Sequence, residues 1–145
     1  MLRLFNLSLI IFLLFTFLSF SQDEEVIEVK VSKDKVETGE VFTYRIKIEG
    51  SFTQPELTLP EFKDFKVISQ SRSKNYAFKQ GRKKVIHNLV YQLFAPNPGA
   101  FTIKEAVLED RGKKFKSESI TIEVKGRPLE EKRKILPYIE KGTEI

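Results

Sequence analysis

Strict two-residue alternation between Val41 and Glu49 constrains the fold of this chain more than any other feature. Apolar side chains there alternate with polar ones, namely Phe42, Tyr44, Ile46 and Ile48 with Thr43, Arg45, Lys47 and Glu49. Because neighbouring residues of a β-strand point to opposite faces, the pattern predicts a strand with one buried and one solvent-facing side. Other stretches that read as strands recur along the chain, at residues 26–32, 57–59, 65–70, 75–78, 85–95, 101–107 and 115–124.

Turn signals separate these stretches roughly every 8 to 12 residues, which is typical of antiparallel all-β domains. Gln80-Gly81 predicts the turn of a long hairpin. No stretch between 22 and 126 shows a convincing helical period, and 145 residues allow one domain. We therefore predict an all-β fold for residues 22–126, an immunoglobulin-like antiparallel β-sandwich of seven to eight strands. A small barrel is the alternative. The apolar residues change from odd to even positions between Phe115 and Ile120, which indicates a bulge.

The first 21 residues have the pattern of a targeting segment. Arg3 is their only charge, residues 4–20 are mostly Leu, Ile and Phe, and Ser19 and Ser21 supply small residues for a cleavage before Gln22. These three parts predict a secretory signal peptide over residues 1–21, with an uncleaved N-terminal anchor as the alternative. Either reading predicts an exported protein, in the periplasm or on the extracytoplasmic face of the membrane.

The absence of cysteine shapes what holds such a domain together. With neither Cys nor Trp, the likeness to antibody domains is one of architecture only, and core packing has to stabilise the fold without disulfides. Of the 13 Phe, eight follow the predicted signal peptide, and we expect them to supply much of the bulk of the core: Phe42, Phe52, Phe62, Phe65, Phe78, Phe94, Phe101 and Phe115.

Candidate catalytic chemistry is sparse. Zero cysteine excludes thiolate zinc sites, iron–sulfur clusters and a cysteine nucleophile, and one histidine excludes multi-histidine metal sites. That histidine, His87, lies in a predicted strand, and no Asp or Glu occurs between Lys66 and Lys104 to orient it. The adjacent acids Glu109 and Asp110 precede a predicted turn and are interpreted as turn residues, not as an acid–base pair. We expect no enzyme activity, no metal and no cofactor.

The order of these features resembles the N-terminal domain of the BatD, or oxygen-tolerance (aerotolerance), family of bacterial cell-envelope proteins. The similarity covers about residues 26–126. It rests on stretches that occur in the same order along the chain, namely 36–42 (VETGEVF), 59–67 (LPEFKDFKV), 69–73 (SQSRS), the Gln80-Gly81 hairpin, 91–103 (YQLFAPNPGAFTI) and 117–124 (SESITIEV).

The resemblance implies a non-catalytic extracytoplasmic module built of immunoglobulin-like domains. The family is generally encoded beside a MoxR-type ATPase and von Willebrand A-domain membrane proteins, and it is linked to oxygen or stress tolerance. A partner in the envelope, such as one of those A-domain proteins, is therefore implied. Longer family members usually carry several domains and a C-terminal transmembrane helix, whereas this chain is expected to have one domain and a polar tail.

Charge is segregated along the chain. Between Lys66 and Lys104 there are eight basic residues and no acidic one, so the predicted hairpin has a positive tip with Tyr76 and Phe78 beside it. The candidate partner-binding residues are Arg72, Lys74, Lys79, Arg82, Lys83 and Lys84. They predict binding of a protein partner through a sheet edge or this basic hairpin. One alternative is a binding domain for anionic glycan or lipid headgroups. Another is that the cations only protect an edge from aggregation.

Export argues against nucleic acid as a partner, despite a sequence pI of about 9.3. Membrane contact is expected only through an uncleaved N-terminal segment or the basic hairpin. Residues 127–145, with five basic and four acidic residues, are expected to form a charged tail or linker. A short partner-binding helix from Pro128 to Leu136 is the alternative there.

Overall fold

The computed structural model describes residues 26–130 and contains ten β-strands over that range. The prediction of an all-β fold is confirmed. The strands outnumber the expected seven to eight because two predicted stretches, 101–107 and 115–124, each divide between two sheets, and because the strand at Lys35–Glu37 was not predicted. Their bounds are β1 (Ile27–Val31), β2 (Lys35–Glu37), β3 (Phe42–Gly50), β4 (Glu56–Thr58), β5 (Lys66–Lys79), β6 (Arg82–Phe94), β7 (Gly99–Ile103), β8 (Val107–Asp110), β9 (Lys113–Lys116) and β10 (Ile120–Lys125).

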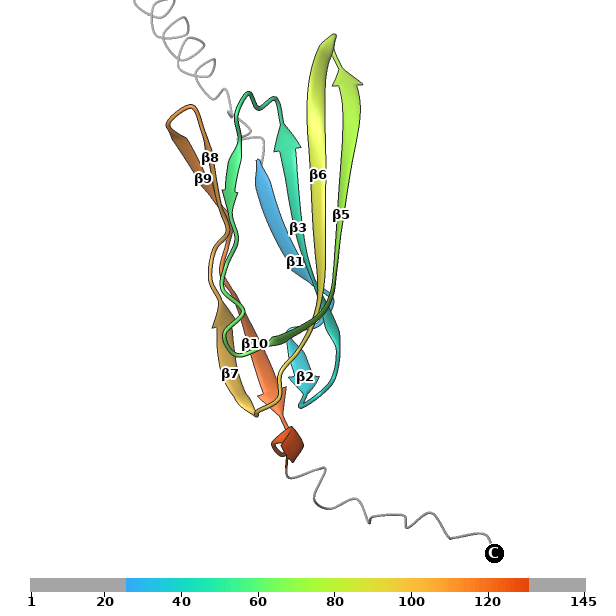
Figure 1. Cartoon of the computed structure of the whole chain (residues 1–145), viewed down its shortest axis with the longest axis vertical. Helices are drawn as coiled ribbons and strands as arrows, with labels where there is room; N and C mark the ends of the chain where they lie inside the picture. The colour runs from blue at the N-terminus through green and yellow to red at the C-terminus, as the bar shows by residue number, and fades with distance from the viewer. Residues whose placement is uncertain (1–25, 131–145) are drawn as a thin grey trace, which may run out of the picture.

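These strands form three sheets, arranged as the sandwich that was predicted (Figure 1). The four-stranded sheet has the order β1-β3-β6-β5, and all its pairs are antiparallel. Opposite it lie the β10 sheet, ordered β2-β10-β7, and the β8 sheet, ordered β4-β8-β9. The pair of β2 with β10 is parallel. The chain therefore crosses between the layers several times, as expected of a sandwich.

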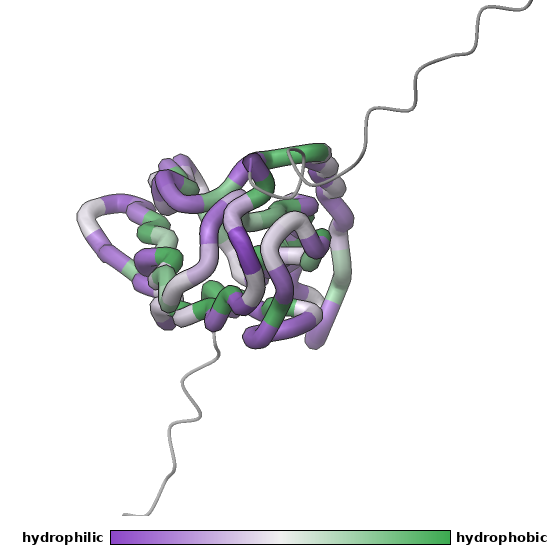
Figure 2. Tube along the Cα trace, turned by 90° about the horizontal axis from the view of Figure 1, so that it is seen from below, coloured by the Kyte–Doolittle hydropathy of each residue, from purple (hydrophilic) through white to green (hydrophobic). Residues whose placement is uncertain are grey.

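The core lies between these layers and follows the alternation in the sequence. On β3, Phe42, Tyr44, Ile46 and Ile48 are all buried, while the residues between them are half-buried or exposed. Buried residues of β6 continue this inner face, and buried residues of the opposite sheets cover it, namely Leu89, Tyr91 and Leu93, and then Val36, Ile103, Leu108, Ile122 and Val124. Figure 2, which views the sandwich from below, shows hydrophobic and hydrophilic segments interspersed along the tube.

Phenylalanine supplies the core unevenly. Phe65, just before β5, packs edge-on against Phe42 at a ring-centroid distance of 5.5 Å and against Phe101 at 6.0 Å. It thereby joins the four-stranded sheet to β7 of the β10 sheet. Phe78, in contrast, is 75% exposed, so the expectation that it belongs to the core is wrong. It lies near the end of a hairpin that no opposite sheet covers.

Two buried tyrosines place hydroxyl groups in this apolar interior. Tyr44 and Tyr91 are paired across β3 and β6, and neither hydroxyl has a hydrogen-bond partner among residues 26–130. Burial raises the pKa of Tyr44 to about 12, with a further contribution from Tyr91. The rings pack with Phe62, at centroid distances of 5.5 Å from Tyr44 and 5.2 Å from Tyr91. Aromatic packing therefore offsets the cost of burying the two unsatisfied hydroxyls.

The parity shift between Phe115 and Ile120 has a different origin from the predicted bulge. Phe115 belongs to β9 and Ile120 to β10, which are in different sheets. Ser117 marks the crossing, where its hydroxyl accepts a 2.8 Å hydrogen bond from the Ala106 amide. The register shift that does occur lies in β5, between Val67 and Ser69.

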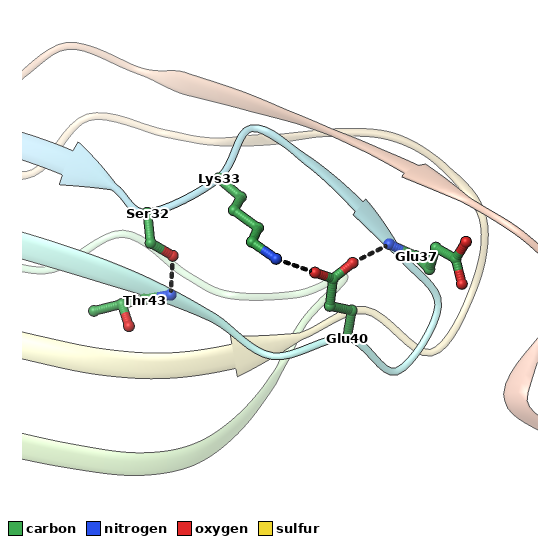
Figure 3. Close-up of polar contacts among 5 residues, drawn as sticks. All are labelled: Ser32, Lys33, Glu37, Glu40 and Thr43. Atoms are coloured by element: carbon green, nitrogen blue, oxygen red, sulfur yellow. Dashed lines mark hydrogen bonds and ion pairs between the residues drawn. The ribbon is translucent and has the colours of Figure 1, made fainter.

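Between β2 and β3 the chain turns on a network of polar contacts (Figure 3). The Glu40 carboxylate accepts hydrogen bonds from Lys33 Nζ and from the Glu37 amide, the latter at 2.9 Å. The Lys33 contact is the main reason that the pKa of Glu40 lies below its ordinary value. Nearby, the Ser32 hydroxyl accepts from the Thr43 amide at 2.9 Å. These contacts fix the path by which the chain leaves β1, adds β2 to the other layer and returns as β3.

Gly39 in this turn contacts the chain after the last strand. Its φ is +82°, and a Cβ at this position would lie 2.8 Å from Leu129 Cδ2. The Leu129 amide donates to the Pro96 carbonyl at 3.0 Å, and the Thr38 hydroxyl donates to the Arg127 carbonyl at 2.6 Å. Residues 127–129 are thus attached to the sandwich. The predicted signal peptide and most of the predicted tail or helix lie outside the described residues.

We expect Gly39→Ala to lower the free energy of unfolding by about 2 kcal/mol, because it combines an unfavourable positive φ with displacement of Leu129. Gly112→Ala is the matched control, since Gly112 has a φ of +76° and, apart from its chain neighbours, no heavy atom of residues 26–130 lies within 4 Å of its Cβ position. That control isolates the backbone term, about 1 kcal/mol. Urea unfolding of both variants measures the difference, and equal losses would show that the contact with Leu129 adds no stability.

Candidate functional site

The predicted long hairpin is present and is formed by β5 and β6. Gln80 and Gly81 connect the strands with φ values of 51° and 72°, and positive φ at both central residues is what a type I′ turn requires. β5 runs without interruption from Lys66 to Lys79. The hairpin extends beyond the ends of β1 and β3 at the top of Figure 1. β3 pairs with β6 as far as Val85, so only the end of the hairpin, residues 77–84, which we call the distal hairpin, is built from two strands alone.

The register of this hairpin divides the six candidate cations between two faces. Residues paired across antiparallel strands lie on the same face. Arg72 pairs with the buried Leu89, Lys74 pairs with His87, and Lys83 pairs with Phe78, which places these three cations on the inner face that carries the core. Lys79 pairs with Arg82, and Lys84 pairs with Ala77. Each of these residues is next in sequence to an inner-face residue, so Lys79, Arg82 and Lys84 lie on the outer face.

Sequence reasoning treated the six cations as one cluster and missed this division. A two-residue turn at Gln80-Gly81 pairs residue 79 with 82 and residue 78 with 83, and each further pair follows by counting. The signal was therefore present in the sequence once the turn had been located. Which of the two faces points inward depended on the burial of Leu89.

Cations and aromatic rings meet on the inner face of the hairpin, toward its turn. Lys83 Nζ lies 4.2 Å from the centre of the Tyr76 ring and Lys74 Nζ lies 5.5 Å from it, distances that allow cation–π attraction. Tyr76 is 53% exposed and Phe78 is 75% exposed. Together with Arg72, these residues form an exposed surface that we call the inner-face cluster: Arg72, Lys74, Tyr76, Phe78 and Lys83.

An apolar groove lies next to this cluster, between the four-stranded sheet and the β8 sheet. It has a volume of about 210 Å³, and its apolar lining includes Ile48, Phe52, Leu57 and Leu108. Arg72 and His87 supply polar groups from β5 and β6. The Gln70 amide oxygen accepts from Arg72 Nε and Nη2 at 2.9 and 2.8 Å in the amide orientation that satisfies both groups. These bonds orient the guanidinium along β5.

His87 is a partly buried strand residue. Its cross-strand partners are Ile48 on β3 and Lys74 on β5. Burial lowers the pKa of His87, and the positive charge of Lys74 lowers it further. Both effects favour the neutral imidazole at neutral pH.

Glu109 and Asp110 have separate structural partners. The Asp110 carboxylate accepts hydrogen bonds from the backbone amides of Thr53 and Gln54, with a distance of 2.8 Å to Gln54. Glu109 lies 3.6 Å from Lys114 across β8 and β9. Asp110 thus orders the loop after β3, next to the groove. Within residues 26–130, no group of three His, Asp or Glu side chains is placed to hold a metal ion.

Comparison with known proteins settles the family. Residues 29–124 match the family model described as the BatD DUF11 like domain. The chain belongs to the BatD family. This finding confirms the resemblance drawn from the sequence, and the matched range runs from β1 to β10. No curated protein matches the chain. In the part of the BatD-family chain from 26 to 130, no helix has the length and apolar character needed to cross a membrane.

The exposure of Phe78 predicts that its ring contributes little to folding. We expect Phe78→Ala to change the free energy of unfolding by less than about 0.5 kcal/mol. Phe65→Ala is the matched comparison, because Phe65 is buried between two other rings, and its loss should cost about 3–5 kcal/mol. Chemical denaturation measures both. A large loss for Phe78→Ala would mean that the ring is covered in solution.

Proposed function

We propose that this BatD-family chain is a non-catalytic cell-envelope module that binds a protein partner through the β5–β6 hairpin and its sheet edge. The observation that carries the proposal is β5 itself. It is a fourteen-residue strand at the end of its sheet, and every residue except Ala77 is exposed. Long exposed edge strands are normally shortened, covered or bent, because they pair readily with other chains. An edge of this length therefore fits a binding surface.

The charge of the hairpin supports an acidic partner. Its cations are distributed over both faces, and no acidic residue lies between Lys66 and Lys104. A surface of one sign accelerates encounter with a surface of the opposite sign and disfavours like-charged partners. Because we expect the chain to be exported, we propose a partner in the envelope, and the family resemblance makes a von Willebrand A-domain membrane protein one candidate.

Two charge-reversal variants test this function, each changing three cations to glutamate. The inner-face variant changes Arg72, Lys74 and Lys83, and the outer-face variant changes Lys79, Arg82 and Lys84. Both alter the net charge equally. We expect capture of envelope proteins by the full chain to fall at least about tenfold in one or both variants, measured by pulldown and quantitative mass spectrometry. Unchanged capture by both would contradict binding through the hairpin.

A second candidate function is binding of anionic lipid headgroups or an anionic glycan. It is favoured by the same excess of basic residues along the hairpin and by the Lys–Tyr contacts of the inner-face cluster. In that case the purified chain should be retained on anionic liposomes or an anionic glycan resin without any protein partner. Retention should decrease steeply between about 0.05 and 0.5 M salt. Absence of retention at low salt on both supports would remove this candidate.

A further inference from the structure

The free edge of β5 offers backbone groups in a regular row. Within residues 26–130, β5 ends the order β1-β3-β6-β5, and its pairing with β6 is continuous from Ser69 to Lys79. In an antiparallel pair, about half of the amide and carbonyl groups of each strand point away from the partner strand. Those of β5 point toward solvent. A further extended segment can bind to them as an added strand.

The two faces of this edge have different chemistry. On the inner face, two cations are followed by two exposed aromatic rings, in the order Arg72, Lys74, Tyr76 and Phe78. On the outer face, the corresponding positions carry small or polar side chains, namely Ser71, Ser73, Asn75 and Ala77. An added strand would place its own alternating side chains beside these two rows. The edge can therefore discriminate between partner strands by which face carries their charged and apolar side chains, and by the order in which those side chains follow one another.

Charge argues against a second copy of this chain as the added strand. The charged residues of β5 are Lys66, Arg72, Lys74 and Lys79, and all four are positive. Pairing two β5 edges would bring these cations together across the new interface, and directly opposed like charges are destabilising. The complementary segment is one that supplies carboxylates.

We infer that β5 binds an extended acidic segment of its partner by antiparallel strand addition, with apolar side chains against Phe78 and Tyr76 and carboxylates against Lys74 and Arg72. This inference rests on the proposed function and names the partner's binding element. Antiparallel pairing sets the order, so that the two apolar residues precede the two acidic ones in the partner, each separated by one residue. Small polar residues suit the intervening positions on the outer face.

A labelled heptapeptide, Phe-Thr-Val-Thr-Glu-Thr-Glu, tests this inference with the full chain kept in a mild detergent. All four recognised side chains lie on one face of the extended peptide. The control, Phe-Glu-Val-Glu-Thr-Thr-Thr, has the same composition but carries both glutamates on the other face. By fluorescence anisotropy at low salt we expect the control to bind at least about tenfold more weakly. Equal binding of the two peptides would show that β5 does not recognise which face of the peptide carries the glutamates.

Matched protein variants separate local contacts from overall charge. Arg72→Glu with Lys74→Glu should weaken binding of the heptapeptide at least about tenfold. Arg82→Glu with Lys84→Glu makes the same change in net charge on the outer face, and it should alter binding by less than about threefold. Circular dichroism and the unfolding midpoint show whether each variant remains folded. Similar effects of the two variants would overturn the assignment to the inner face.

Two N-methylated heptapeptides test strand addition itself, since methylation removes backbone amide donors. Neighbouring amides of an extended strand point to opposite sides, so methylating alternate residues blocks one edge only. One methylation pattern should abolish binding and the other should preserve it, and equal effects of both would overturn strand addition. If no heptapeptide binds while the charge-reversal variants still lose envelope capture, strand addition is wrong and the proposed function stands. If capture is also unchanged, both are wrong.

Discussion

The pairing of β3 with β6 along one buried face is the constraint on which the rest of the structure depends. It sets Tyr44 opposite Tyr91 and Ile46 opposite Leu89, so that one face of both strands forms half of the core. A slip of one residue would expose every one of these side chains. Because β6 continues without a break into the distal hairpin, the same register also decides which cations of β5 and β6 lie on the inner face. Core and candidate site therefore share one geometric origin.

The body and the distal hairpin differ in what surrounds them. In the body, the inner face of the four-stranded sheet is covered by the β10 and β8 sheets, and Phe65 links the layers through its ring contacts. Beyond the groove, the same face carries Tyr76 and Phe78 in the open, accompanied by cations. The sheet thus continues as a projection whose apolar surface no other part of the described chain covers. This projection is the surface that we propose as the partner-binding site of this BatD-family protein.

Much of the fold was predictable because burial leaves a period-two trace in the sequence. The strand at 42–50, the hairpin around Gln80-Gly81 and the all-β class follow from alternation and turn residues. The errors occurred where alternation alone is ambiguous. A change of sheet between Phe115 and Ile120 shifts the alternation of apolar residues just as a bulge would. Phe78 has the apolar side chain of a core residue, but no second sheet covers it. The local sequence pattern indicates to which face of a strand a side chain points, but not whether another sheet covers that face.

The sequence by itself determined the class of the fold, the family to which the chain belongs, the hairpin and its excess of positive charge. Those properties are local, or are sums over residues, and they require no knowledge of which strands become neighbours. Only the tertiary structure decided that β5 ends its sheet, that Arg72, Lys74 and Lys83 share a face with Tyr76 and Phe78, and that a groove lies next to them. These features depend on contacts between segments far apart in the chain, and the packing of the layers selects those contacts by burying one face of each strand.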